Sequence, residues 1–171
     1  MLLCGSRAAG GSMSAEPAFE PDRVVAALNA AEVAYVIVGG LAVGAHGVVR
    51  ATRDVDIVAA PDQRNMDRLA ECLQTLGGEH PIEGPLTGAA LARPASFKVQ
   101  TKHGEVQVLN RMDGIPGFAE LRRDQIYVEI ASDAVAPVCS LAHLRAMKRA
   151  ADRPRDRVDL AELAELHGPA W

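Results

Sequence analysis

Two acidic residues separated by one apolar residue form the part of the sequence best suited to chemistry. Asp54 and Asp56 belong to the segment DVDIV at 54–58, which alternates acidic and apolar residues as a half-buried strand does. Alternate strand residues project to the same face, about 7 Å apart, so both carboxylates can reach one site. Such a pair suits Mg²⁺, which binds one or two protein carboxylates and completes its shell with water and phosphates.

A glycine pair upstream adds a phosphate-binding element. The apolar run at 34–38 ends in Gly39-Gly40, followed by an Ala-rich stretch at 41–46 and Gly47. The pair alone indicates only a tight turn, but ahead of two acids it predicts that backbone amides approach a triphosphate at a helix N-terminus. Arg50 is placed to neutralise phosphate charge from the same rim.

The elements that must position these residues alternate between strands and helices. Gly77-Gly78 ends one helix that Asp62 caps, Ser140 caps another, and Pro154 begins the last. The stretch 79–93 is rich in Gly and Pro and predicts either a surface excursion near the active face or a mobile loop. We predict helices at 22–31, 41–46, 61–76, 117–122, 140–151 and 154–166, strands at 34–38, 54–58, 126–130 and 135–138, and a hairpin of 97–101 with 105–109.

Composition limits the class of protein. The chain has 171 residues, 49% of them hydrophobic but only 4% aromatic, which favours one α/β (α+β) domain with an aliphatic core. A formal net charge of -4 argues against a protein that coats nucleic acid through bulk positive charge. Cys4, Cys72 and Cys139 are widely spaced and form no CxxC, which fits a reducing compartment and excludes a disulfide framework or a zinc site.

The domain organisation follows from the N-terminal residues and from hydropathy. Residues 1–20 predict a flexible leader without the pattern of a secretory signal, and Met13 offers an alternative start. Residues 21–171 form the predicted domain. The sequence contains no apolar run of the roughly 20 residues that a membrane-spanning helix needs. We therefore expect a cytoplasmic protein without membrane contact.

The combined pattern resembles a known superfamily. Val38-Gly39-Gly40-Leu41-Ala42, followed by Arg50-x-Thr52-x-Asp54-x-Asp56, is similar to the polymerase-beta-like nucleotidyltransferases and most closely to the AbiEii-type toxins and related bacterial proteins. The segments 144–148 and 153–160 are similar to the same group. The resemblance covers about residues 33–166. It implies a small mixed sheet flanked by helices, with a C-terminal helical pair.

The resemblance also assigns roles to single residues. It implies that Asp54 and Asp56 are catalytic and bind Mg²⁺, and that Gly39, Gly40, Arg50 and Thr52 bind the nucleotide. It implies further that Lys148 contacts the triphosphate and that Asp156 orients or deprotonates the acceptor hydroxyl, with Asp159 one helical turn away as the alternate candidate.

The sequence departs from the superfamily pattern at one position. Where the wider superfamily commonly has a third carboxylate on a later strand, this chain has Gln107, which offers a neutral oxygen instead. Glu105 shares a strand face with Gln107. It lies two residues earlier, however, which displaces its side chain by about 7 Å along the strand. Lys148 and its basic surroundings also fit a solvated helical face.

Three functions follow from these residues. The first is Mg²⁺-dependent transfer of a nucleoside monophosphate from an NTP to a hydroxyl acceptor, for which the resemblance implies RNA, particularly tRNA ends, and an antitoxin partner; aminoglycosides represent the other acceptor class. The second is a catalytically degenerate domain that binds nucleotide or a partner protein, as Gln107 suggests. The third is a metal-dependent hydrolase that uses the same acids to activate water.

Overall fold

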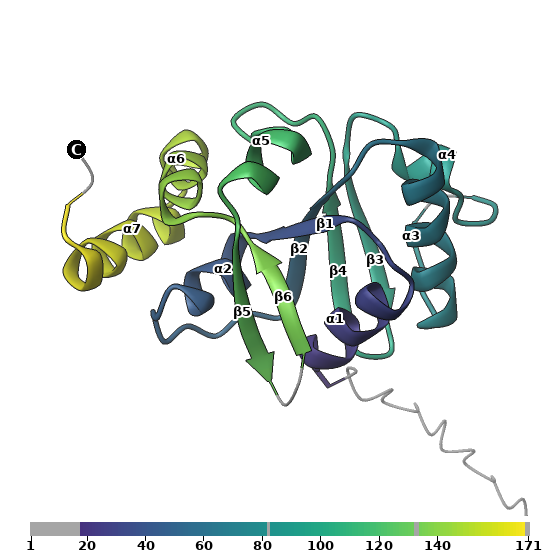
Figure 1. Ribbon diagram of the computed structural model, residues 1–171, viewed down its shortest axis with the longest axis horizontal. Helices are drawn as coiled ribbons and strands as arrows, with labels where there is room; N and C mark the ends of the chain where they lie inside the picture. Colours follow the sequence, from purple (N-terminus) through teal and green to yellow (C-terminus); the bar gives the residue numbers. More distant parts are fainter. Residues whose placement is uncertain (1–17, 82, 132–133, 170–171) are drawn as a thin grey trace, which may run out of the picture.

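The computed structural model of the chain describes residues 18–81, 83–131 and 134–169. In these residues six strands form one mixed sheet in the order β3-β4-β2-β1-β6-β5, with helices around it (Figure 1). The strands are β1 (Tyr35–Val38), β2 (Asp54–Ala59), β3 (Ser96–Thr101), β4 (Gly104–Leu109), β5 (Ile126–Ala131) and β6 (Ala134–Val138). The helices are α1 (Pro21–Ala30), α2 (Gly39–Ala45), α3 (Gln63–Thr75), α4 (Gly88–Leu91), α5 (Phe118–Arg123), α6 (Leu141–Ala151) and α7 (Pro154–His167). The predicted fold class, a small mixed sheet flanked by helices with a C-terminal helical pair, is confirmed.

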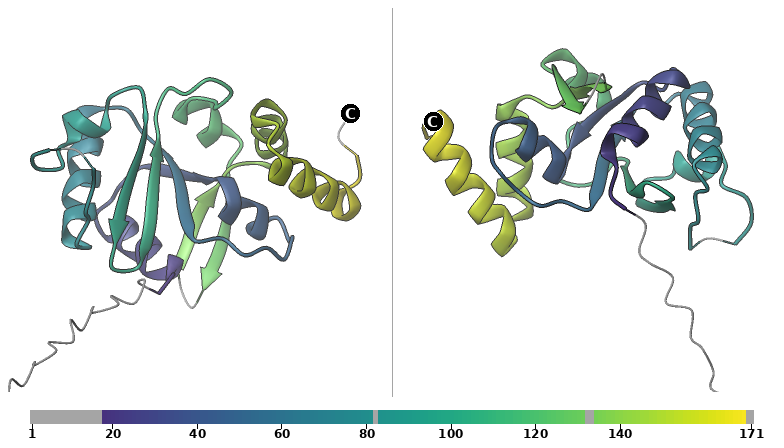
Figure 2. Two further views of the ribbon diagram at one scale, coloured as in Figure 1. Left: turned by 180° about the vertical axis from the view of Figure 1, so that it is seen from behind. Right: turned by 90° about the horizontal axis from the view of Figure 1, so that it is seen from below.

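The two faces of β2, β3 and β4 differ in polarity. Val55, Val99 and Val106 are fully buried on one face, on the side where α1 and α3 lie. The opposite face carries Asp54, Asp56 and their neighbours, and a view from behind looks onto β3 and β4 with no helix in front of them (Figure 2). The alternation read from the sequence therefore holds, and both acids point away from the apolar core.

Most predicted elements are confirmed to within two residues. The predicted hairpin is β3 and β4, which pair antiparallel, and Asp62 caps α3 by accepting a hydrogen bond from the backbone N–H of Asn65 at 3.0 Å. Ser140 caps α6 in the same way, accepting from the N–H of His143 at 3.3 Å. These elements follow from local signals, which explains why sequence alone placed them.

Two predictions need correction. The helix expected at 41–46 begins at Gly39, directly after β1, so the glycine pair forms the first turn of the helix rather than a turn ahead of it. The stretch 79–93, expected as a surface excursion near the active face or a mobile loop, contains α4 and pairs Glu79 with Gln100 at the far edge strand β3. Leu86 and Leu91 are buried there against the core, which gives this stretch a packing role away from the site.

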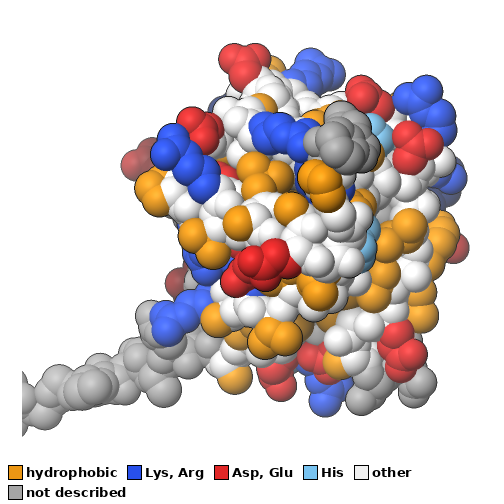
Figure 3. Space-filling view, turned by 90° about the vertical axis from the view of Figure 1, so that its left-hand side faces the viewer, with side chains coloured by type: hydrophobic (Ala, Val, Ile, Leu, Met, Phe, Trp, Pro, Cys, Tyr) orange, Lys and Arg blue, Asp and Glu red, His pale blue; other side chains and the backbone are white. Residues whose placement is uncertain are grey.

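The C-terminal helices are joined by a sharp turn. Asp152 ends α6 in the left-handed conformation at φ 45°, and Pro154 begins α7 at its favoured first position. The two helices pack against each other, and α6 also contacts α2. Seen from the side of α7, acidic, basic and hydrophobic side chains are interspersed (Figure 3). This face presents no continuous basic surface for a nucleic acid among the described residues.

The predicted N-terminal leader is described by the structure only at its last residues. Residues 1–17 of the predicted leader, with Met13 and Cys4, lie outside the described residues, whereas Glu20 at its end donates its N–H to the carbonyl of His103 at 2.9 Å. Every helix that the structure describes is too short or too polar to cross a membrane.

A buried asparagine ties the strands that carry the site to α3. Asn65 accepts a hydrogen bond from the N–H of Ala34 at 2.7 Å and donates to the carbonyls of Ala34 and Ala60, both at 3.0 Å. We expect Asn65→Ala to lower the free energy of unfolding by about 2 kcal/mol, because it leaves these backbone groups unpaired. Denaturant unfolding measures the change. Gln63→Ala, on the exposed side of the same helix, serves as the control, and an equal effect of both substitutions would contradict the role of Asn65.

Candidate functional site

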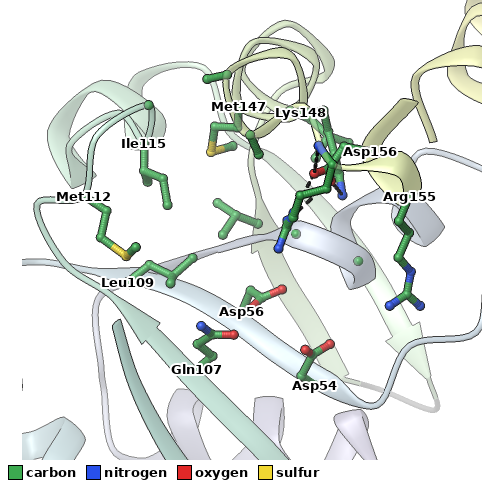
Figure 4. Close-up of a pocket in the computed structure, with 18 of the residues that line it drawn as sticks. Asp54, Asp56, Gln107, Leu109, Met112, Ile115, Met147, Lys148, Arg155 and Asp156 are labelled. Carbon is green, nitrogen blue, oxygen red and sulfur yellow. Dashed lines mark hydrogen bonds and ion pairs between the residues drawn. The ribbon is translucent and has the colours of Figure 1, made fainter. Parts of the chain in front are cut away.

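A cavity of about 420 Å³ lies between the acid-bearing face of the sheet, the beginning of α2 and the C-terminal helices (Figure 4). Of the eight residues that the sequence nominated, Thr52 alone does not line it. The other seven do: Gly39, Gly40, Arg50, Asp54, Asp56, Lys148 and Asp156. The tertiary structure therefore brings together residues as far apart in the chain as Gly39 and Asp156.

The two aspartates meet in a poorly hydrated position. Burial, and then the neighbouring charge of Asp54, raise the pKa of Asp56 to about 6, although a hydrogen bond from the N–H of Gly40 and the charges of Lys148 and Arg153 act in the opposite direction. Two carboxylates in one partly buried place repel each other. A cation between them would remove that repulsion.

The glycine pair leaves the room that this arrangement needs. Gly39 has a φ of 66°, and a Cβ there would overlap the Asp56 carboxylate. A Cβ on Gly40 would come within 2.7 Å of the Thr52 hydroxyl oxygen. Both glycines therefore serve the packing of the acid-bearing strand against α2, a reason that spacing in the sequence did not reveal.

Thr52 acts on the site through a hydrogen bond to Asp54. Its hydroxyl donates to Oδ1 of Asp54 at 2.8 Å. This bond fixes the orientation of the Asp54 carboxylate, which lines the cavity. The structure thus places Thr52 as a residue that orients Asp54, whereas the resemblance assigned it to the nucleotide.

A network of buried ion pairs forms the wall opposite the sheet. Nζ of Lys148 lies 2.8 Å from Oδ1 of Asp156 and 2.7 Å from Oδ2 of Asp159, and the three side chains are at most 6% exposed. Arg50 joins them with Nη1 at 2.8 Å from Oδ2 of Asp159. The network connects the loop before β2 to α6 and α7, and both Asp156 and Asp159 belong to it.

Two arginines outside the set of predicted site residues also line the cavity. Nε of Arg153 lies 2.7 Å from Oδ2 of Asp156, yet its side chain is 72% exposed. Arg155 donates to the carbonyl of Ala51 at 3.0 Å. The signal that could have found them is the run Arg-Pro-Arg-Asp, which places two arginines at the start of α7 next to Asp156.

The same contacts determine the ionisation of Asp156. Burial acts to raise its pKa, but hydrogen bonds from Arg153 and Lys148, together with their positive charges, prevail and lower the pKa to about 2. Asp156 is therefore a stable carboxylate at neutral pH. Such a low pKa makes it a weak acceptor for a proton.

Gln107 lies directly beside Asp56 on the neighbouring strand and lines the cavity. In the parallel register of β2 and β4, Asp56 lies beside Gln107 and Asp54 beside Glu105. The amide nitrogen of Gln107 donates to the hydroxyl of Ser96, and its oxygen points toward the side of the aspartates (Figure 4). Glu105 pairs instead with Lys98, at 2.6 Å, and does not line the cavity.

The donor set decides which metal the site could hold. Among the described residues no group of three or more His, Cys, Asp or Glu side chains could bind a metal ion by itself. Two carboxylates and one amide oxygen nevertheless fit Mg²⁺, whose remaining ligands are commonly water and substrate phosphates. The residues therefore fit a cation that arrives together with a phosphate ligand.

No histidine or cysteine among the described residues lines the cavity. Cys72 and Cys139 are buried, and burial raises the pKa of the Cys139 thiol to about 12. The backbone carbonyl of Cys139 pairs with Nε2 of His46 at 2.9 Å, and Nδ1 of His103 pairs with Glu20 at 2.7 Å. Both histidines have structural partners outside the cavity.

Solved structures share this architecture. The lincosamide antibiotic adenylyltransferase LnuA, determined with lincomycin bound, matches at TM-score 0.58 and 15% identity over 88% of this chain and 99% of its own. ANT(2'')-Ia in complex with adenylyl-2''-tobramycin matches at 0.55 and 16%, over 83% and 84%. An antigenic nucleotidyltransferase-like protein from Paracoccidioides brasiliensis matches at 0.55 and 16%, over 85% and 72%.

These likenesses are likenesses of fold. No protein-family model and no curated protein sequence matches the chain. The chain has a nucleotidyltransferase-like fold, as the resemblance implied, but a specific closeness to AbiEii-type toxins is not among the findings.

The lowered pKa of Asp156 predicts a contribution to stability that depends on pH. Because the folded pKa lies at about 2 and the ordinary value is 3.8, the contribution is complete above about pH 4 and disappears as the pH falls toward 2. We expect the difference in unfolding free energy between wild type and Asp156→Asn to shrink by about 2 kcal/mol over this window. Denaturant unfolding at pH 6, 4, 3 and 2 measures it. A difference that stays constant with pH would contradict the ion-pair assignment.

Proposed function

We propose that the chain transfers a nucleoside monophosphate from a nucleoside triphosphate to a hydroxyl acceptor, with Mg²⁺ as cofactor. The observation that carries this proposal is the position of Asp54 and Asp56, whose carboxylates face one cavity opposite the cationic groups of Lys148 and Arg153. Nucleotidyl transfer requires little covalent chemistry from the protein. It requires positioned charges on both sides of a phosphate, and this cavity offers them.

The aspartates have the metal-binding role in this proposal. Asp54 and Asp56 would hold Mg²⁺, and Thr52 keeps Asp54 in orientation through its 2.8 Å hydrogen bond. Bound there, Mg²⁺ supplies neutralisation of the phosphate charge and polarises the phosphate under attack. The amide oxygen of Gln107 adds a neutral ligand beside Asp56.

The cationic wall binds the triphosphate. The ammonium of Lys148 has three N–H donors, of which Asp156 and Asp159 take two, so one donor remains for a phosphate oxygen. Arg153 adds a guanidinium that is held at one edge by Asp156 and otherwise exposed. Gly39 and Gly40 keep side chains out of this part of the cavity.

Asp156 has a positioning role in the same scheme. It fixes Lys148 and Arg153 at 2.8 and 2.7 Å, and its pKa of about 2 makes it a poor base for the acceptor hydroxyl. Asp159 fixes Lys148 and Arg50 in the same manner. Of the two roles that the resemblance implied for Asp156, deprotonation is therefore the less supported.

Different observations support different acceptors. The resemblance to AbiEii-type proteins supports an RNA or tRNA acceptor and an antitoxin partner. The similar fold of LnuA, which was determined with lincomycin, and of ANT(2'')-Ia, which was determined with adenylyl-2''-tobramycin, supports a small molecule.

A second candidate function rests on Gln107. With an amide where the superfamily pattern has a carboxylate, the chain would bind a nucleotide or a partner protein without turnover. The register that puts Gln107 directly beside Asp56 supports this candidate, because no acid other than this pair is placed to bind the same ion among the described residues.

Removing one carboxylate tests the proposed function. We expect Asp54→Ala to lower the rate of transfer from α-labelled NTP by a factor on the order of 10³, because the site loses half of its metal-binding charge. The measurement is label transferred from each NTP in Mg²⁺ to total RNA and to small hydroxyl compounds. Mg-NTP affinity, measured by calorimetry, should fall as well.

The control for this test is Glu71→Ala, which removes an exposed carboxylate from α3, on the opposite side of the sheet. It should leave transfer and binding unchanged. An inactive Asp54→Ala protein that still binds Mg-NTP with wild-type affinity would count against the metal-binding role. Release of free NMP without a labelled acceptor would indicate a hydrolase instead.

Adding a carboxylate separates the two candidates. We expect Gln107→Asp to raise the affinity for Mn²⁺ in the absence of nucleotide about 10-fold, because neighbouring strands place the new acid about 5 Å from Asp56. Calorimetric titration measures it, and Gln100→Asp on the exposed face of β3 is the control. Transfer by the wild type removes the degenerate candidate, whereas transfer that only Gln107→Asp performs establishes it.

A further inference from the structure

The cavity has two chemically different ends. Beyond the aspartates, on the side away from Arg155, its wall is built from aliphatic and thioether side chains of β4, α6 and the loop between β4 and α5 (Figure 4). These residues are Leu109, Met112, Ile115, Leu144 and Met147. The cationic groups lie toward the other end, so an occupant of the cavity would meet charge at one end and apolar surface at the other.

The loop that supplies part of this wall has a constrained backbone. Arg111 adopts a φ of 47°, which is uncommon for a residue with a side chain, and Gly114 a φ of 77°. The N–H of Ile115 bonds to the carbonyl of Met112 at 3.1 Å, and a Cβ on Gly114 would come within 2.8 Å of the Cβ of Ala150 on α6. The loop is thus closed on itself and packed against α6, which turns Met112 and Ile115 toward the cavity.

The geometry of nucleotidyl transfer assigns the ends. Displacement at the α-phosphorus is in line, so the attacking hydroxyl and the leaving pyrophosphate lie on opposite sides of it. Pyrophosphate carries most of the negative charge and belongs with Lys148, Arg153 and Arg155. With the α-phosphorus at Asp54 and Asp56, the attacking hydroxyl comes from the apolar end.

We infer that the apolar end is the acceptor subsite and that the acceptor is a small hydroxyl compound with an apolar body. The inference rests on the proposed function. In the reaction the acceptor oxygen forms a bond to the α-phosphorus, the bond from that phosphorus to the bridging oxygen breaks, and pyrophosphate leaves with the electron pair. The proton of the hydroxyl passes through water to the solvent.

The chemistry of the wall excludes other occupants. RNA ends and nucleobases are commonly held by aromatic stacking, by hydrogen bonds to base edges and by cations on the phosphates. Of the described residues that line the cavity none is aromatic. Between Met112 and Ile115 the lining carries one charged side chain, the carboxylate of Asp113, which would repel a phosphate. Leucine, isoleucine and methionine instead suit an aliphatic ligand, to which methionine adapts its shape.

The test changes the apolar end without touching the charged one. Met112 is 36% exposed, so Met112→Gln should fold, and Val158→Gln on the exposed part of α7 is the matched control at 56% exposure. The probes are α-labelled NTPs with Mg²⁺, offered total RNA or the small-molecule fraction of a cell extract supplemented with lincomycin. We expect label in the small-molecule fraction, on a product that reversed-phase chromatography retains longer than NMP.

The variant should then affect only the acceptor. We expect Met112→Gln to raise KM for the labelled acceptor about 10-fold and to change the Kd for Mg-NTP less than twofold. The control Val158→Gln should behave like the wild type in both measurements. A raised Kd for Mg-NTP in Met112→Gln would put the nucleobase at the apolar end and overturn the inference. Label on RNA would overturn it as well, and so would the absence of label from both fractions while NTP binding is intact. Loss of Mg-NTP binding by the wild type would instead contradict the proposed function itself.

Discussion

The site depends on one buried ammonium group held between two buried carboxylates. Lys148 on α6 meets Asp156 and Asp159 on α7, and Arg50 reaches the second of them from the loop before β2. Charges removed from water in this way are stable only when all are paired, because a lone partner would remain desolvated and uncompensated. The network therefore fixes the C-terminal helices to the loop before the central strand β2, and with them the wall of the cavity.

A second constraint lies across the cavity. Asp54 and Asp56 share one strand face, and burial with mutual repulsion raises the pKa of Asp56. The N–H of Gly40 and the opposing positive charges only partly offset that repulsion. The cavity thus places two acidic side chains that repel each other opposite a wall whose cations are partly satisfied, an arrangement that a metal-bound phosphate would complete from both sides. The apolar surface beyond it leaves room for a partner in the reaction.

Local signals were sufficient for most of the fold. Asp62, Ser140 and Pro154 begin their helices as the sequence predicted, since capping needs only a side chain and the next few amides. The prediction from sequence was wrong for segments whose structure depends on packing against distant parts of the chain. Residues 79–93 have no clear period, yet Leu86 and Leu91 bury against the core and organise them. The position at which α2 begins accepts only a glycine, because a Cβ on Gly39 would overlap the Asp56 carboxylate of β2.

The sequence by itself determined that Asp54 and Asp56 share a face, because strand residues alternate without reference to the rest of the chain. It also indicated that Gln107 stands where an acid is expected. Only the tertiary structure decided that Gln107 lies beside Asp56, that Lys148 is paired with Asp156 and Asp159, and that Arg153 and Arg155 reach the cavity. Strand register and helix packing are set by contacts between residues far apart in the chain, and no local pattern encodes them.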